Sequence, residues 1–252
     1  MKRIIHKLSI ICFLAVIAAG KVSGQAAQTD TGASQSALNN VTANFYLNIG
    51  QQSRLYSGHE YPPYDPHIKG TALYPLDAQS WAMGDVTYDG FIYKNVPLKY
   101  DIYKDIVVSL LYNHFSSYIL LSERVSAFGF SGHRFVRVSA DKLENDKSGI
   151  STGFYDQLYG GKSEVLARRS KTVQNSTNQT LALETYFIEA NDYYVRKGNT
   201  YYKVSGQGAF LNVFKDKKPE LQKYMKDSGF KFRTDPEVAM ARLAAYYDQI
   251  TN

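Results

Sequence analysis

Cysteine is almost absent from this chain. The single cysteine, Cys12, lies in an apolar run near the start of the sequence. Without that run no thiol remains, which excludes disulfide bonds, a cysteine nucleophile, thiolate zinc sites and thiol redox chemistry. Stability must therefore come from the burial of apolar side chains, and 21 tyrosines and 13 phenylalanines supply much of that surface.

A large excess of positive charge is also missing. The formal net charge is +6, and Lys2, Arg3, Lys7 and Lys21 stand in residues 1–24, which contain no acidic residue. Subtracting these four charges from +6 leaves +2 for the rest of the chain. This is an ordinary protein surface, so the sequence pI of about 9.1 does not indicate a nucleic-acid partner.

The sequence has no apolar run long enough to span a membrane. The longest run, residues 8–19, is too short for a transmembrane helix. Positive residues precede it and the small residues 22–24 follow it, which is typical of a secretory signal peptide cleaved before Gln25. The alternative is an N-terminal anchor or a buried helix. We expect residues 1–24 to be a signal peptide and the mature protein to be exported, periplasmic or outer-membrane-associated, without a transmembrane segment.

Familiar catalytic motifs are missing as well. The chain has no G-x-S-x-G nucleophile elbow, no glycine-rich phosphate loop and no dinucleotide fingerprint. No catalytic residue can be named and no cofactor is expected. The sequence therefore favours a non-enzymatic binding or envelope-assembly protein. The alternative is a hydrolase of an envelope or extracellular polymer that uses carboxylates brought together by the fold.

Short turns separate many stretches with strand character. The strongest hairpin signal is Asp89-Gly90, because this dipeptide accepts the positive φ angles of a type I′ turn. Residues 118–130 indicate one long or bulged strand. We also expect turns at residues 160–161, 191–192 and 198–199 and a polar loop at 171–180.

The period of the pattern changes near the end of the chain. Residues 216–227 have helical spacing, and residues 234–237 form a capping box with a proline in the first turn. Met240, Leu243 and Tyr247 then mark one face of a closing helix.

These signals predict a mainly β (α+β) protein. We expect a disordered leader at residues 25–40, an antiparallel β domain with an N-terminal Pro/Tyr-rich loop at 41–208, and a helical pair packed on the sheet at 209–252. The β domain should be a single antiparallel meander that forms an open barrel or curved sheet, closed by the two C-terminal helices. A two-sheet sandwich is the alternative.

Several stretches together resemble a group of exported β-rich proteins of Bacteroidetes-type Gram-negative bacteria for which no activity is established. They are residues 55–61 (LYSGHEY), 84–90 (GDVTYDG), 98–102 (LKYDI), 217–224 (KKPELQKY) and 246–248 (YYD). The resemblance implies export and β architecture, and it implies no catalytic or binding residue.

Two constellations of polar residues could carry chemistry. His59, Glu60, Asp65 and His67 stand within nine residues of a proline-stiffened loop, and imidazole with carboxylate suits zinc, so His59 and His67 are candidate metal ligands. The alternative is a solvated loop. A second possibility is acid–base chemistry by the pairs His114 with His133 or Asp101 with Asp105, although aspartate is also a common turn residue.

The candidate ligand-binding residues are aromatic. Tyr61 and Tyr64 stand in the loop 59–67, whose prolines reduce the entropic cost of ordering, and Trp81 is the only tryptophan. We expect these three residues to form the rim of a site for a small ligand, a glycan or an envelope protein. The alternative is that this segment plugs one end of the barrel.

Overall fold

The computed structural model of the chain describes residues 31–49, 54–75, 80–111, 113–143, 148–177 and 183–251. The predicted signal peptide lies outside the described residues, and so do residues 25–30 of the predicted leader. Helix α1 (Thr31–Ile49) occupies residues 31–40, so the structure differs there from the expected disordered segment. This stretch has no proline and contains alanine and leucine, which favour helix.

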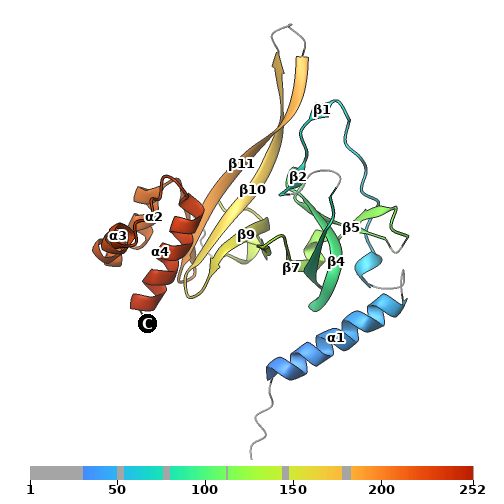
Figure 1. Cartoon of the computed structure of the whole chain (residues 1–252), viewed down its shortest axis with the longest axis horizontal. Coiled ribbons are helices and arrows are strands. Elements are labelled where there is room, and N and C mark those ends of the chain that lie inside the picture. Colours follow the sequence, from blue (N-terminus) through green and yellow to red (C-terminus); the bar gives the residue numbers. More distant parts are fainter. Residues whose placement is uncertain are drawn as a thin grey trace, which may run out of the picture.

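Within the described residues, twelve strands form one sheet (Figure 1). They are β1 (Ile68–Lys69), β2 (Leu73–Tyr74), β3 (Ala82–Tyr88), β4 (Phe91–Asp101), β5 (Ile106–Leu110), β6 (Ser117–Ile119), β7 (Val125–Phe130), β8 (His133–Val138), β9 (Gly153–Gly160), β10 (Glu164–Thr177), β11 (Leu183–Lys197) and β12 (Thr200–Val204). Short 3-10 helices lie at Arg54–Tyr56, Ser122–Arg124, Ala140–Lys142 and Lys215–Lys217.

The sheet is open, and its strand order is β1-β11-β10-β9-β8-β7-β3-β4-β5-β6, with β12 beside β11 and β2 beside β4. The mainly β class and the open, curved sheet are confirmed, whereas the sandwich alternative is not found. The single antiparallel meander is not correct in detail. Two meanders meet where β3 pairs with β7, and β1 runs parallel to β11.

The 3-10 turn at Ser122–Arg124 explains this difference. It interrupts residues 118–130, which the sequence pattern predicted as one strand, and separates β6 from β7. Strand β7 can then pair with β3 instead of continuing the edge made by β6.

The β3–β4 hairpin forms as its sequence predicts. Asp89 and Gly90 have φ angles of +51° and +80°, the left-handed values that this turn requires. The strands of this part of the sheet enclose an aromatic core. Its centre includes Phe128 and Phe135, whose ring centroids lie 4.8 Å apart, and the fully buried Tyr100.

Strands β10 and β11 extend well beyond the rest of the sheet as a twisted two-stranded arm (Figure 1). Their pairing is continuous from Glu164 opposite Arg196 to Thr177 opposite Leu183. The loop predicted at 171–180 is therefore wrong for residues 171–177, and the turn predicted at 191–192 is wrong because β11 continues through it.

Three helices follow the sheet instead of two: α2 (Gln207–Val213), α3 (Lys218–Asp227) and α4 (Pro236–Ile250). The Asp235 side chain caps α4 by accepting a hydrogen bond from the Val238 N–H at 3.1 Å. The helices pack against the part of the sheet formed by β9 to β12. The buried contacts are made by Val165, Val195 and Val204 of the strands with Phe210, Leu221 and Leu243 of the helices.

Candidate functional site

Residues 58–74, here called the bridging segment, connect distant parts of the sheet. The segment pairs with β6 where the Tyr61 N–H donates to the Ser117 carbonyl at 2.9 Å. It then pairs with β11 through β1 and with β4 through β2. A Cβ at Gly58 would lie 1.6 Å from the Ile119 carbonyl oxygen, so a side chain there would clash with β6. Backbone pairing therefore fixes the segment at three places.

A lysine from the arm also holds the bridging segment. The Lys171 ammonium donates hydrogen bonds to the carbonyl oxygens of Thr71 at 2.8 Å and Leu73 at 2.7 Å. Burial lowers the pKa of Lys171 below its usual value. This contact joins the arm to the bridging segment across about one hundred positions of sequence.

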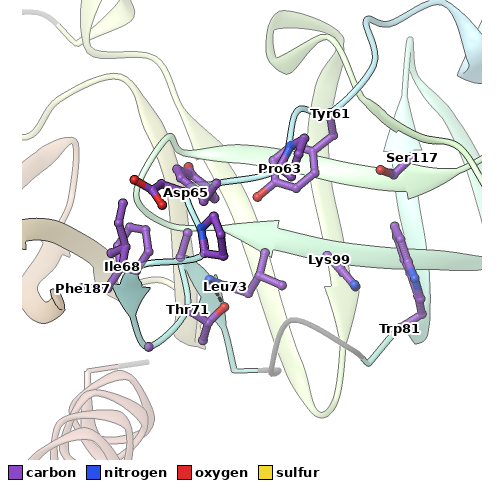
Figure 2. Close-up of a pocket in the computed structure, with 14 residues that line it drawn as sticks. Tyr61, Pro63, Asp65, Ile68, Thr71, Leu73, Trp81, Lys99, Ser117 and Phe187 are labelled. Carbon is purple, nitrogen blue, oxygen red and sulfur yellow. Dashed lines mark hydrogen bonds between the residues drawn. The ribbon is translucent and has the colours of Figure 1, made fainter. Parts of the chain in front are cut away.

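A pocket of about 670 Å³ lies beneath the bridging segment (Figure 2). This volume falls within the range of small-molecule sites, roughly 300–1,000 Å³. Aromatic side chains from three separate parts of the chain line it: Tyr61 and Tyr64 from the bridging segment, Trp81 from the residue before β3, and Phe187 from β11. The structure therefore brings together all three residues that the sequence analysis proposed for ligand binding.

Asp101 holds the two tyrosines of the pocket. Its Oδ2 accepts hydrogen bonds from the hydroxyls of Tyr61 at 2.9 Å and Tyr64 at 2.6 Å. Its Oδ1 accepts from the N–H groups of Tyr103 and Lys104, both at 2.9 Å. The carboxylate is fully buried, and these four donors satisfy it. Burial, together with the neighbouring Asp101, raises the pKa of both phenols above the usual value, so both remain protonated donors.

Edge-to-face contacts fix the aromatic wall further. The Tyr64 ring lies 6.3 Å from that of Tyr61 and 5.3 Å from that of Phe187 between centroids. Tyr103 adds a contact of 5.6 Å with Phe187. These rings come from the bridging segment, the turn after β4 and the arm, and they form one packed surface.

Lys99 of β4 lies at the end of the pocket beside Trp81. Its ammonium is 4.3 Å from the centroid of the Trp81 ring, and the residue is 7% exposed. This distance is typical of a cation–π contact. The sequence analysis did not identify Lys99, because its position in a strand gives no sign that it faces a cavity.

The proposed metal ligands are not assembled into a site. His59 lies where the bridging segment pairs with β6, and its carbonyl accepts a hydrogen bond from the Ile119 N–H. His67 lies just before β1 with a side chain 91% exposed, and its Nδ1 is 2.7 Å from the Asp65 carboxylate. Among the described residues, no three His, Cys, Asp or Glu side chains are grouped so that they could hold a metal ion.

The proposed acid–base pairs are engaged in structural contacts. Asp105 accepts a hydrogen bond from the Tyr100 hydroxyl at 2.6 Å and pairs with Arg168 at 2.9 Å, whereas Asp101 has the donors described above. His133 pairs with Asp156, and His114 lies in the loop between β5 and β6. Asp101, Asp105 and His133 thus bind other groups, and no contact joins the two members of either proposed pair in the described residues.

A buried charge network joins α4 to the sheet. Arg169 of β10 donates to Asp156 at 2.7 Å and to Glu237 at 2.8 Å. His133 Nδ1 lies 2.8 Å from the same Asp156 oxygen, and the Tyr193 hydroxyl donates to Glu237 at 2.8 Å. Burial alone would raise the pKa of Glu237, but the hydrogen bonds from Arg169 and Tyr193 lower it below its usual value. No local pattern in the sequence indicates this network.

In the part of the chain that the structure describes, no helix is long and apolar enough to cross a membrane. Comparisons of the chain with protein-family models, curated proteins and solved structures found no match. The resemblance to exported β-rich proteins therefore remains an expectation. The lining of the pocket is the feature that bears on function.

Proposed function

We propose that this protein is a non-enzymatic binding protein whose aromatic pocket takes a small ligand or a glycan. The observation that carries the proposal is that Tyr61, Tyr64 and Trp81 line one pocket. Aromatic side chains present flat apolar faces that stack on sugars and other rings. The partner could equally be an envelope protein that presents a sugar or another ring to the pocket.

Contacts within the protein hold the side chains of the pocket in place. Asp101 orients both tyrosine hydroxyls, and backbone pairing with three strands fixes the bridging segment that carries the rings. A site whose side chains are already ordered loses less conformational entropy on binding than a flexible loop would. This rigidity supports a binding role and argues against a segment that only fills space.

The distribution of carboxylates favours binding over hydrolysis. A glycosidase-type mechanism requires two carboxyl groups in one cleft. Four pockets formed by described residues contain one acidic residue each, namely Asp65, Glu164, Asp235 and Glu60. Asp156 and Glu237 do converge, but Arg169 lies between them and binds both carboxylates.

We place the protein in the periplasm or at the outer membrane, because residues 1–24 have the pattern of a signal peptide. Fractionation of Gram-negative cells that express a C-terminally tagged protein checks this. We expect the tagged chain in the periplasmic or outer-membrane fraction with Gln25 at its N-terminus. Recovery of the unprocessed chain in the cytosol would contradict export.

Alanine variants of the pocket should bind ligand more weakly. A panel of disaccharides, aromatic acids and short peptides is first tested on the wild-type protein by titration calorimetry. For a compound that binds, we expect Trp81→Ala and Tyr64→Ala to lower the affinity by about tenfold or more, because each removes an aromatic contact in the pocket. Thermal unfolding of the same variants, followed by circular dichroism, reports stability separately.

Tyr202→Ala is the matched control, since Tyr202 is 42% exposed on β12 and does not line the pocket. It should bind as the wild type does. If the pocket variants lose thermal stability but keep the wild-type affinity, the segment is a plug and the binding proposal fails.

A further inference from the structure

Strand β10 has a free edge along the outer half of the arm. It pairs with β9 only from Glu164 to Ala167, and farther along the Lys171 N–H donates to the Ile102 carbonyl at 3.3 Å. Beyond Lys171, no backbone group of the described residues pairs with this side of β10. Residues 172–177 are all exposed. A strand edge of this kind is a template for pairing with another strand.

The pairing of β10 with β11 decides which backbone groups point outward from this edge. Along a strand, the N–H and C=O groups of successive residues point to alternate sides. The Lys171 N–H points away from β11, toward Ile102. The residues that follow at intervals of two are Val173, Asn175 and Thr177, so their N–H and C=O groups point the same way. No other described residue binds these groups.

The free edge lacks the features that usually prevent strands from pairing with other molecules. Such edges are commonly protected by charged side chains, proline or a β-bulge. Residues 172–177 contain no charged residue and no proline, and their pairing with β11 has no bulge. The nearest charge on the strand is Lys171, whose ammonium is held by the carbonyl oxygens of Thr71 and Leu73. The edge is therefore open to a strand that is itself uncharged.

We propose that this edge binds a second copy of the chain, with the two β10 strands antiparallel and Asn175 opposite Asn175. In this register Val173 of each copy lies opposite Thr177 of the other. All three positions have their N–H and C=O groups on the free edge, so each opposed pair exchanges two hydrogen bonds. The same edge serves both copies, as a twofold-symmetric dimer requires.

Charge favours this occupant and this orientation. Each copy offers the other an uncharged strand, so no like charges stand opposite each other between residues 173 and 177. The two Lys171 residues lie at opposite ends of the paired segment. A parallel arrangement would bring them side by side, where their charges repel.

The shape of the molecule also allows the pairing. The arm projects beyond the rest of the sheet (Figure 1). Because the two β10 strands are antiparallel, the remainder of each molecule lies at an opposite end of the joined arms. The Ile102 contact at Lys171 ends the free edge and limits the pairing to a short segment. We therefore expect a weak dimer whose fraction rises with protein concentration.

Sedimentation equilibrium of the full chain tests the proposal. We expect the average mass of the wild-type protein to rise with concentration from that of one chain toward that of two. Asn175→Lys places two like charges opposite each other and should raise the dissociation constant of the dimer about fivefold or more, and Asn175→Asp should do the same. An equal mixture of the two variants should dimerise again, because opposite charges then meet.

The mixture and a further variant serve as controls. The Asn175 side chain also accepts a hydrogen bond from the Thr185 hydroxyl at 2.9 Å, and both variants lose this amide. Recovery in the mixture therefore shows that the charge on the facing copy causes the effect. Tyr202→Lys adds the same charge to an exposed residue of β12, outside the arm, and should dimerise as the wild type does. Circular dichroism verifies that all variants are folded.

Cross-linking locates the contact. Asn175→Cys is made together with Cys12→Ser, so that the introduced thiol is the only one in the chain. Residues opposite each other in a hydrogen-bonded antiparallel pair have Cα atoms about 5.5 Å apart, which suits a disulfide. Under mild oxidation we expect this variant to form linked dimers about tenfold faster than Tyr202→Cys in the same background, because pairing raises the effective concentration of the thiols.

Three results would overturn the proposal. The first is an average mass that stays at one chain at every concentration. The second is a dimer that Asn175→Lys leaves unchanged, which would place the contact on another surface. The third is cross-linking of Asn175→Cys no faster than that of Tyr202→Cys.

Discussion

Arg169→Met should lower the free energy of unfolding by about 3–5 kcal/mol, the cost typical of breaking a buried ion pair. Arg169 and Asp156 are each 3% exposed at the side chain, and Arg169 also binds Glu237. The substitution leaves two acidic groups close together with no guanidinium between them, while Asp156 keeps its contact with His133. Urea unfolding followed by circular dichroism measures the change.

Two further variants make this result specific. Lys203→Met removes the exposed ion pair with Asp192 and should cost at most about 1 kcal/mol. Adding Asp156→Asn and Glu237→Gln to Arg169→Met should recover much of the loss, because no buried charge then lacks its counterion. A loss in Arg169→Met no larger than that in Lys203→Met would show that the network does not hold α4 to the sheet.

Asp101→Ala should damage both stability and binding. The substitution removes the acceptor for two tyrosine hydroxyls and two backbone N–H groups in a fully buried position. Buried donors without acceptors cost about 1–3 kcal/mol each, and the two hydroxyls can turn toward other partners, so we expect a net loss of about 3 kcal/mol. The pocket rings would also lose their fixed orientation, and affinity for a ligand should fall with stability.

Asp101→Asn separates the two effects. The asparagine keeps the shape of the side chain and one carbonyl oxygen. It lacks the negative charge, and its amide nitrogen cannot accept the hydrogen bonds that the second carboxylate oxygen accepts. We expect both losses to be smaller than in Asp101→Ala. If Asp101→Ala binds ligand with the wild-type affinity, Asp101 does not organise the site.

Local sequence signals predicted the parts of the fold that depend on local geometry. The Asp89-Gly90 turn formed because two positive φ angles are required there and this dipeptide supplies them. Helix α4 begins at the predicted proline, but its cap is Asp235 and not Thr234, the first residue of the predicted capping box, because the Asp235 side chain accepts the hydrogen bond from Val238. The arm was missed because residues 172–177 are exposed and, apart from Val173, polar, so they lack the apolar alternation by which strands are recognised.

The residues of the candidate site also differ in whether local sequence signals point to them. Tyr61, Tyr64 and Trp81 could be proposed because they stand in or near a proline-rich loop with an unusual aromatic content. Asp101 was considered only for acid–base chemistry and Lys99 was not considered at all, because their roles in the pocket depend on partners brought to them by pairing across the sheet. The two hydroxyl groups that donate hydrogen bonds to Asp101 belong to residues about forty positions away in sequence.

The most direct measurement uses the only tryptophan of the chain as a reporter. Trp81 lines the pocket, so a ligand that enters it must change the environment of the indole. We predict that titrating the panel into the wild-type protein produces a saturable change in tryptophan fluorescence with one site per chain, and that Tyr64→Ala weakens it. A compound that binds by calorimetry without changing Trp81 emission, or a panel in which nothing binds, would contradict a ligand site in this pocket.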